Sequence, residues 1–277
     1  MESISIKRLS FSHTVLASSE LPKIPNKSIS NILNKTFSTT GFTKAILLPK
    51  PLEILKNVSL SLEKGDILCI SGKSGEGKST LLRVIAGLEK ASSGEITLFD
   101  EHIKPSEWTA LSMAQRGLGF VFQNNALLSD LTVRDNIAVP LRYNKMMGTE
   151  DEIEQRVDRA LLLMLARSFA NEYPYSLSLG MRKRVAIARA WAMDAKILLL
   201  DEPTAGLDKN SRNNLLSLIK NLRGLYKTTI LMVVSDLLVA RDLDSKISFL
   251  IDKKLSDPMY YNEIRNNEDS RIRAMVM

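Results

Sequence analysis

Hydrophobic and polar residues alternate in two segments in the first quarter of the chain, and this alternation predicts half-buried β-strands. The first segment covers residues 4–12. The second covers residues 57–62, where three aliphatic side chains point to one side before a Lys-Gly-Asp turn. These two strands are expected to lie side by side at the surface of a larger core.

From residue 65 onward, fully apolar segments alternate with segments of helical periodicity. Apolar strands are predicted over residues 67–71, 197–200 and 229–234. Helices are predicted over residues 79–86, 152–167, 182–193 and 211–225. Strands that are apolar throughout are typical of a parallel sheet covered by helices on both faces. The pattern therefore predicts an α/β fold, in which residues from about 124 to 192 are mostly helical.

Residues 14–50 break this order, because they are rich in Ser, Thr, Asn, Lys and Pro and contain Glu20 as their only acid. They could form an N-terminal targeting peptide or a surface loop inserted between the first two strands. A strand precedes the segment, and Glu2 and Glu20 are unusual in a targeting peptide. We therefore favour the inserted loop.

Composition limits the class of protein. Of the 277 residues, 44% are hydrophobic and 25% are charged, as in an ordinary soluble globular protein. The single cysteine, Cys69, lies in an apolar strand and has no partner for an internal disulfide, which favours a reducing compartment. Apolar stretches are far shorter than the ~18 residues that cross a bilayer, so no membrane span is expected.

The net charge of +7 admits several partners. Nucleic acid, an anionic membrane surface or an acidic protein could each bind a basic chain. Alternatively, the positive charge could form only a solvent-exposed basic face with no partner. Aromatic residues make up only 6%, without interleaving of basic and aromatic positions. A base-stacking surface is therefore not expected, and nucleic acid is not a predicted partner.

The strongest chemical signal is a glycine-rich loop between the strand at 67–71 and the helix that follows. It matches G-x-x-x-x-G-K-[ST], and with the next residue it comprises Gly72, Lys73, Ser74, Gly75, Glu76, Gly77, Lys78, Ser79 and Thr80. Such loops surround phosphates with backbone N–H groups at a helix N-terminus. Lys78 is expected to reach the β- and γ-phosphates, and the Ser79 hydroxyl to bind Mg²⁺.

Two acidic residues, Asp201 and Glu202, directly follow the apolar strand at 197–200. The carboxyl ends of parallel strands share one edge of a sheet, so these acids are expected beside the glycine-rich loop. We predict that Asp201 holds Mg²⁺ through water and that Glu202 polarises the attacking water. A pair of acids that only caps the following turn is the structural alternative.

Three shorter motifs follow in a fixed order. They are Phe120-Val121-Phe122-Gln123, Leu177-Ser178-Leu179-Gly180-Met181-Arg182-Lys183-Arg184 and Ala205-Gly206-Leu207-Asp208. Together with the glycine-rich loop and the two acids, this order resembles the ATP-binding subunits of ABC transporters. The resemblance implies a P-loop NTPase fold with a mostly parallel sheet, an antiparallel β subdomain and a helical subdomain. It also implies ATP and Mg²⁺ as cofactors.

The resemblance also assigns roles to individual residues. Gln123 would contact Mg²⁺ and the attacking water. Ser178 and Gly180 would close over the ATP of a second subunit, and Asp208 would be the aspartate of the following loop. His13 would stand where an aromatic residue stacks on adenine, although an ordinary surface histidine is an open alternative.

Two positions depart from the family pattern. Leu179 stands where the family's signature motif, which begins here at Leu177-Ser178, has a glycine, so a bulky side chain lies where a neighbouring γ-phosphate approaches the backbone. Ser235 stands where the family has a histidine, and it reaches less far and carries no positive charge. The expected catalytic residues are Glu202, Gln123 and Ser235, and the two departures are expected to affect hydrolysis rather than binding of Mg-ATP.

Residues 122–142, 180–185 and 269–273 look like the ATPases of MCE-linked (Mla-type) lipid transporters. This implies a homo- or heterodimer, two permease subunits and an MCE-type lipid-binding protein, at the cytoplasmic face of the inner membrane. The ATPase domain would cover residues 1–256 and a tail residues 257–277. Open alternatives are an ABC importer for another solute, a soluble ABC protein without a permease, and a nucleotide-gated subunit with weak hydrolysis.

Overall fold

The computed structural model describes residues 2–13, 52–143 and 148–276. The segment 14–50, for which we favour an inserted loop over a targeting peptide, lies outside the described residues. That interpretation therefore stays a prediction.

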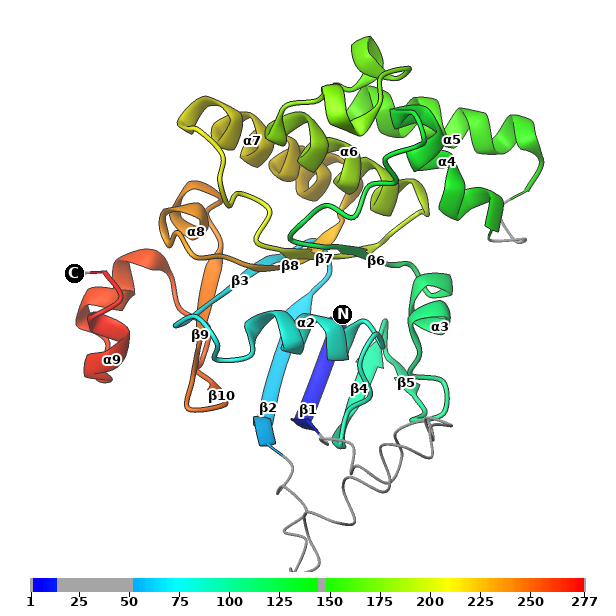
Figure 1. Ribbon diagram of the computed structural model, residues 1–277. Coiled ribbons are helices and arrows are strands. Elements are labelled where there is room, and N and C mark those ends of the chain that lie inside the picture. The colour runs from blue at the N-terminus through cyan, green and yellow to red at the C-terminus, as the bar shows by residue number, and fades with distance from the viewer. Residues whose placement is uncertain (1, 14–51, 144–147, 277) are drawn as a thin grey trace, which may run out of the picture.

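Two β-sheets form the frame of the molecule (Figure 1). A four-stranded antiparallel sheet has the order β2-β1-β4-β5, and a six-stranded sheet has the order β10-β9-β3-β8-β7-β6. The strands are β1 (Glu2–His13), β2 (Leu52–Glu63), β3 (Ile67–Ser71), β4 (Ser93–Leu98), β5 (Glu101–Ile103), β6 (Leu118–Val121), β7 (Ile197–Asp201), β8 (Thr229–Val233), β9 (Lys246–Ile251) and β10 (Lys254–Leu255). All neighbouring pairs of the larger sheet are parallel except β9 and β10.

Helices cover both faces of the larger sheet. The α-helices are α2 (Lys78–Ile85), α3 (Ala110–Gln115), α4 (Val133–Tyr143), α5 (Glu150–Leu163), α6 (Leu179–Ala192), α7 (Lys209–Tyr226), α8 (Leu238–Asp242) and α9 (Ser270–Arg273). Short 3₁₀ turns are η2 (Arg167–Phe169), η3 (Pro174–Ser176) and η4 (Tyr261–Asn266). Within the described ranges, no helix combines the length and apolar character needed to cross a membrane.

The alternation of side chains along the buried strands separates two hydrophobic cores. In β3, Cys69 faces one core, together with α4 to α7, and Ile70 faces the other, together with α2 and the antiparallel sheet. Figure 1 shows α4 to α7 on one side of the larger sheet, with α2 and the smaller sheet on the other. Burial raises the pKa of the Cys69 thiol to about 12, so this cysteine is a core residue rather than a reactive one.

Helix boundaries follow their capping residues. The helical pattern predicted over 182–193 begins earlier in the structure, because the Ser178 side chain caps the N-terminus of α6. The helix predicted over 211–225 likewise begins at Lys209, after Asp208 as its cap. The predicted helix 152–167 ends at Leu163, where the chain turns at Leu165 in a left-handed conformation.

The C-terminal segment packs on the rest of the chain. Ile264 and Ile272 are buried in the same core as α4 to α7, and Met259 bridges to Ile247 of β9. A boundary at residue 256 therefore does not separate a detached tail from the domain. The division into a domain at residues 1–256 and a C-terminal tail at residues 257–277 stays a proposal.

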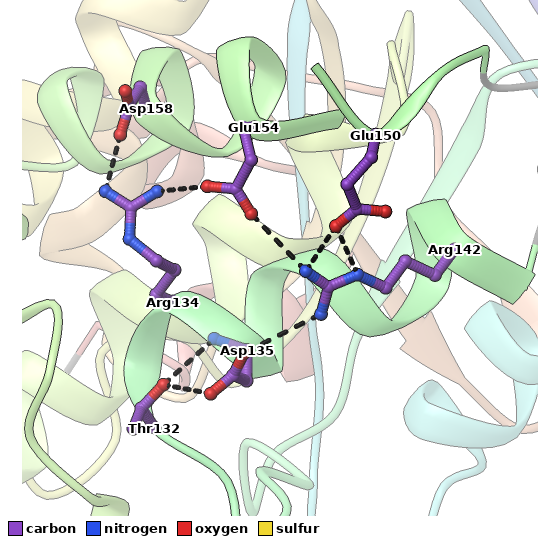
Figure 2. A network of polar contacts seen from close by, with 7 residues as sticks. All are labelled: Thr132, Arg134, Asp135, Arg142, Glu150, Glu154 and Asp158. Carbon is purple, nitrogen blue, oxygen red and sulfur yellow. Dashed lines mark hydrogen bonds and ion pairs between the residues drawn. The ribbon is translucent and has the colours of Figure 1, made fainter. Parts of the chain in front are cut away.

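Charged residues join α4 to α5 through the network shown in Figure 2. Arg134 donates to Glu154 at 2.5 Å and to Asp158 at 2.6 Å. Arg142 contacts Glu150 at 2.5 Å and Glu154 at 3.3 Å. Glu154 thus bridges two arginines that lie more than two turns apart on α4. These contacts raise the pKa of both arginines.

Replacing Glu154 with alanine is expected to loosen α4 from α5 without unfolding the protein. Partly exposed ion pairs contribute about 0.2–1 kcal/mol each, which predicts a fall in Tm of about 1–4 °C. Thermal unfolding by circular dichroism measures the change. The difference should shrink in about 1 M sodium chloride, where screening is strong. Gln155→Ala, at an exposed uncharged position of the same helix, is the control, and an equal loss there would contradict the network's role.

Candidate nucleotide-binding site

Loops from four parallel strands meet at the carboxyl edge of the larger sheet. The pairing of Val233 with both Ile70 and Asp201, and of Val121 with Leu200, aligns the ends of β3, β6, β7 and β8. The loops that follow carry the glycine-rich segment and the polar residues that the sequence singles out. Open parallel sheets bind their ligands at this edge.

The glycine-rich loop occupies residues 72–77, between β3 and α2. Gly72 has φ +149° and Gly77 has φ +97°. A Cβ on Gly72 would lie 2.5 Å from the carbonyl oxygen of Leu250, and one on Gly77 would lie 2.6 Å from Cγ2 of Ile54. Both positions therefore require glycine. No side chain caps the N-terminus of α2, so its first amides are available to an anion.

Lys78 begins α2 and reaches back over the loop. Its Nζ donates to the carbonyl oxygens of Gly72 and Lys73, both at 2.9 Å. The ammonium group is thereby held at the mouth of the loop, where it can also donate to phosphate oxygens. The other predicted phosphate-binding residues lie in the same loop and in the first turn of α2: Ser74, Gly75, Glu76, Gly77, Ser79 and Thr80.

Ser79 and Asp201 form the part of the site that suits Mg²⁺. The Ser79 hydroxyl donates to Oδ1 of Asp201 at 2.8 Å, and Asp201 is only 1% exposed at the end of β7. Hydroxyl and carboxylate oxygens are the hard donors that Mg²⁺ prefers. Over the described residues, no cluster of three His, Cys, Asp or Glu side chains could hold a metal alone. Substrate phosphates and water would complete the coordination, as is usual for Mg²⁺ at nucleotides.

Glu202 is held at both its backbone and its side chain. Its φ is +50°, and its N–H donates to the carbonyl of Val233 at 3.1 Å. Its Oε2 accepts from the Ser235 N–H at 3.1 Å and from the Ser235 hydroxyl at 2.9 Å. Ser235 therefore contacts the acid expected to polarise water, a partner that the sequence did not indicate.

Gln123 lies two residues beyond β6, in an exposed loop. The loop continues through Asn125 and Ala126, which have φ +67° and +46°. Arg189 of α6 donates to the carbonyl oxygens of both residues, at 2.9 Å and 2.7 Å. Burial lowers the pKa of Arg189. The shape of the loop that carries Gln123 is thus fixed by a helix that begins at the signature.

The signature residues lie at the start of α6. The Ser178 hydroxyl accepts from the backbone N–H three residues on, at 3.3 Å. Cδ2 of Leu179 lies 3.0 Å from where a Cβ on Gly206 would stand. A Cβ on Gly180 would lie 3.2 Å from Cβ of Ser211. The bulky Leu179 side chain therefore packs within its own chain, against the loop that leads to α7.

Asp208 caps α7. Its Oδ1 accepts from the N–H groups of Asn210 and Ser211, and its Oδ2 accepts from the Ser211 hydroxyl at 2.6 Å. These bonds, led by the Ser211 hydroxyl, lower the pKa of Asp208. In the part of the chain that is described, no hydrogen bond or ion pair joins Ser178, Gly180 or Asp208 to the glycine-rich loop.

The backbone of His13 ends β1 opposite Leu52 of β2. Its side chain lies outside the described residues, so adenine stacking by His13 stays a prediction.

Sequence reasoning passed over three polar residues that shape these loops, two of them buried and the third partly buried. Lys183 is 3% exposed, and its Nζ donates to the carbonyl oxygen of Glu202 at 3.0 Å. Asn136 is fully buried and makes four hydrogen bonds to the backbone at Leu128, Leu131 and Thr132. Arg189 is the third. The signal for Lys183 was its helical spacing from buried residues on α6, which places a lysine on the core-facing side.

A glycine-rich loop before a helix, a Ser–Asp pair for Mg²⁺ and a parallel sheet define a P-loop nucleoside triphosphatase. The ABC transporter family model matches residues 55–205. The chain belongs to the ABC transporter family and carries its ATP-binding domain. The α/β fold, with its antiparallel β subdomain and helical subdomain, is as expected. The family's cofactors, ATP and Mg²⁺, are also those expected from the sequence.

Individual relatives agree with this assignment. The chain is 38% identical to the methionine import ATP-binding protein of Campylobacter jejuni, over 71% of this chain and 63% of that protein. It is 41% identical to a probable sulfate/thiosulfate import ATP-binding protein of Chlorella vulgaris, over 73% of this chain and 83% of that protein. The dimeric bacterial ABC transporter cassette MJ0796 is similar in structure, with a TM-score of 0.70, 28% identity and coverage of 93% and 98%.

Proposed function

We propose that this protein is the ATP-hydrolysing subunit of an ABC import complex. The observation that carries the proposal is the Ser79–Asp201 pair beside Glu202, at the sheet edge that holds the glycine-rich loop. Two relatives, for methionine and for sulfate or thiosulfate, are import proteins, and they support solute import over lipid transport. The chain spans 63% of the length of the methionine import relative, so its substrate and partners are part of this proposal.

In this mechanism the residues of one chain bind and orient ATP. The loop amides and Lys78 bind the phosphates, and Ser79 with Asp201 would hold Mg²⁺. When bound, Mg²⁺ neutralises charge on the β- and γ-phosphate oxygens. Glu202, fixed by Ser235, would orient and polarise the attacking water, with Gln123 at the same sheet edge.

A second subunit completes each site in the proposed complex. Ser178, Gly180 and Asp208 have no polar contact with the glycine-rich loop of their own chain among the described residues. They would instead face the ATP of a second ATPase subunit, alike or unlike, beneath two permease subunits. The complex would lie at the cytoplasmic face of the membrane, with this chain bound peripherally. The loop held by Arg189 and the α4–α5 pair would face the permease.

Lipid transport with an MCE-type protein is the rival for the same site, based on residues 122–142, 180–185 and 269–273. One experiment separates the two. The tagged chain is purified from its native membranes in mild detergent, and the co-eluting membrane proteins are identified and reconstituted in vesicles. Solute-stimulated ATP hydrolysis with two permease subunits is expected. An MCE protein in the complex would favour lipid transport, and elution without any membrane protein would contradict transport.

Weak hydrolysis is expected of the chain without an unlike partner. Leu179 replaces a glycine in the signature motif, which each chain contributes to the site of the other subunit and where the backbone must approach the nucleotide. Each preorganised donor in such a site contributes about 10²–10³ in rate. Steady-state phosphate release by the purified chain should therefore be slow, and Leu179→Gly and Ser235→His should raise it several-fold. The competing outcome is that the site functions with leucine at this position, because the Leu179 side chain packs on Gly206 of its own chain. Ordinary turnover without gain in either variant would contradict the expectation.

A further inference from the structure

The backbone of Glu202 is held by a lysine that belongs to another part of the site. Lys183 lies in the second turn of α6, the helix that begins at Ser178 and the signature. Its Nζ donates to the carbonyl oxygen of Glu202 at 3.0 Å. The contact therefore links the helix that carries the signature to the loop that carries the acid.

Glu202 needs such support because its backbone is strained. A non-glycine residue at φ +50° lies in the left-handed region that L side chains rarely adopt, and it persists where its surroundings fix it. The Glu202 N–H is bonded to the carbonyl of Val233, and the carboxylate is bonded to Ser235. The carbonyl oxygen accepts from the Ala205 N–H at 3.2 Å, and Lys183 adds a second donor there, a charged side chain from another element.

Burying an ammonium group costs free energy, because the charge loses its hydration. Lys183 is 3% exposed, and burial lowers its pKa, while the carboxylates of Glu202 and Asp201 raise it. An apolar side chain of similar length would fill the same volume without losing hydration. A lysine at this position instead provides a hydrogen bond to the Glu202 backbone and a positive charge near the carboxylates of Glu202 and Asp201.

We propose that Lys183 is a positioning residue for the reaction: it fixes the Glu202 backbone and couples the signature end of α6 to the acid of the same chain. The inference rests on the proposed role of Glu202. In the proposed dimer, α6 of one subunit contacts the ATP of the other subunit through Ser178. Binding of that ATP would therefore set the position of Glu202 in the subunit that contributes α6.

The test compares Lys183→Met with Lys183→Gln in the assembled complex. Methionine keeps the length but cannot donate, and turnover is expected to fall about 10- to 150-fold, the range for a lost charge-assisted hydrogen bond. ATP affinity, measured by titration with a fluorescent ATP analogue, should change less than about twofold. Glutamine keeps an N–H donor and should recover part of the turnover. Lys220→Met, at an exposed position of α7, is the matched control.

The outcomes separate this inference from the proposed function. Because Lys183 acts through Glu202, Lys183→Met should cause no further loss of residual turnover in a Glu202→Gln background. Normal turnover in Lys183→Met, with Glu202→Gln inactive, overturns the inference and leaves the function intact. Equal loss in the Met and Gln variants, or equal loss of ATP affinity and turnover, assigns Lys183 a merely structural role and also overturns it. Full activity of Glu202→Gln overturns the proposed function itself.

Discussion

Replacing Glu202 with glutamine is expected to lower ATP turnover by about 10²–10⁴-fold, the contribution of a positioned general base. Glutamine has the same shape, and its carbonyl oxygen can still accept from the N–H and hydroxyl of Ser235. The local structure and the ATP affinity should therefore be retained, while the group that polarises water is lost. Phosphate release measures the turnover, and binding of a fluorescent ATP analogue measures the affinity.

The control is Glu95→Gln, at an exposed position of β4 away from the sheet edge that binds nucleotide. It should match the unmodified chain in both measurements. If Glu202→Gln kept more than half of the turnover, Glu202 would not be the base, and the acid pair would be left with a capping role at the end of β7.

Lys78→Ala is expected to weaken ATP binding and to abolish measurable turnover. Each charge-assisted hydrogen bond to phosphate contributes about 1.5–3 kcal/mol, so losing one weakens binding about 10- to 150-fold. The loop also loses the two bonds from Nζ to the carbonyl oxygens of Gly72 and Lys73. Isothermal titration with Mg-ATP measures the affinity, and thermal unfolding without nucleotide isolates the effect on the loop.

Lys78→Arg separates these two effects, since it keeps the positive charge but not the geometry of a single ammonium group. It should bind ATP more tightly than Lys78→Ala and still turn over slowly. Lys104→Ala, an exposed lysine beyond β5, is the control for charge alone. Unchanged affinity and turnover in Lys78→Ala would show that the glycine-rich loop does not bind the nucleotide.

Much of the fold could be read from local sequence signals. The strand at 67–71 has the predicted bounds: four consecutive apolar residues precede Ser71, and all five are buried in a strand covered on both faces. The glycine-rich loop and the acids at the end of β7 lie at one sheet edge, as parallel strands require. Helix starts were less predictable, since the side-chain caps at Ser178 and Asp208 extended α6 and α7 beyond their apolar periodicity.

The sequence by itself determined the fold class, through its alternation of apolar strands and helices, and the phosphate loop, through the spacing of its glycines and lysine. It also determined the pairing of that loop with Asp201, because the carboxyl ends of parallel strands share one edge of the sheet. Only the tertiary structure decided which side chains hold the loops in place. Lys183 reaches Glu202, and Ser235 reaches the same acid from the end of β8. These contacts join residues that are 19 and 33 positions apart, and their geometry depends on how α6 packs on the sheet. Sequence periodicity shows that a side chain faces inward, but only the packed structure shows what it meets there.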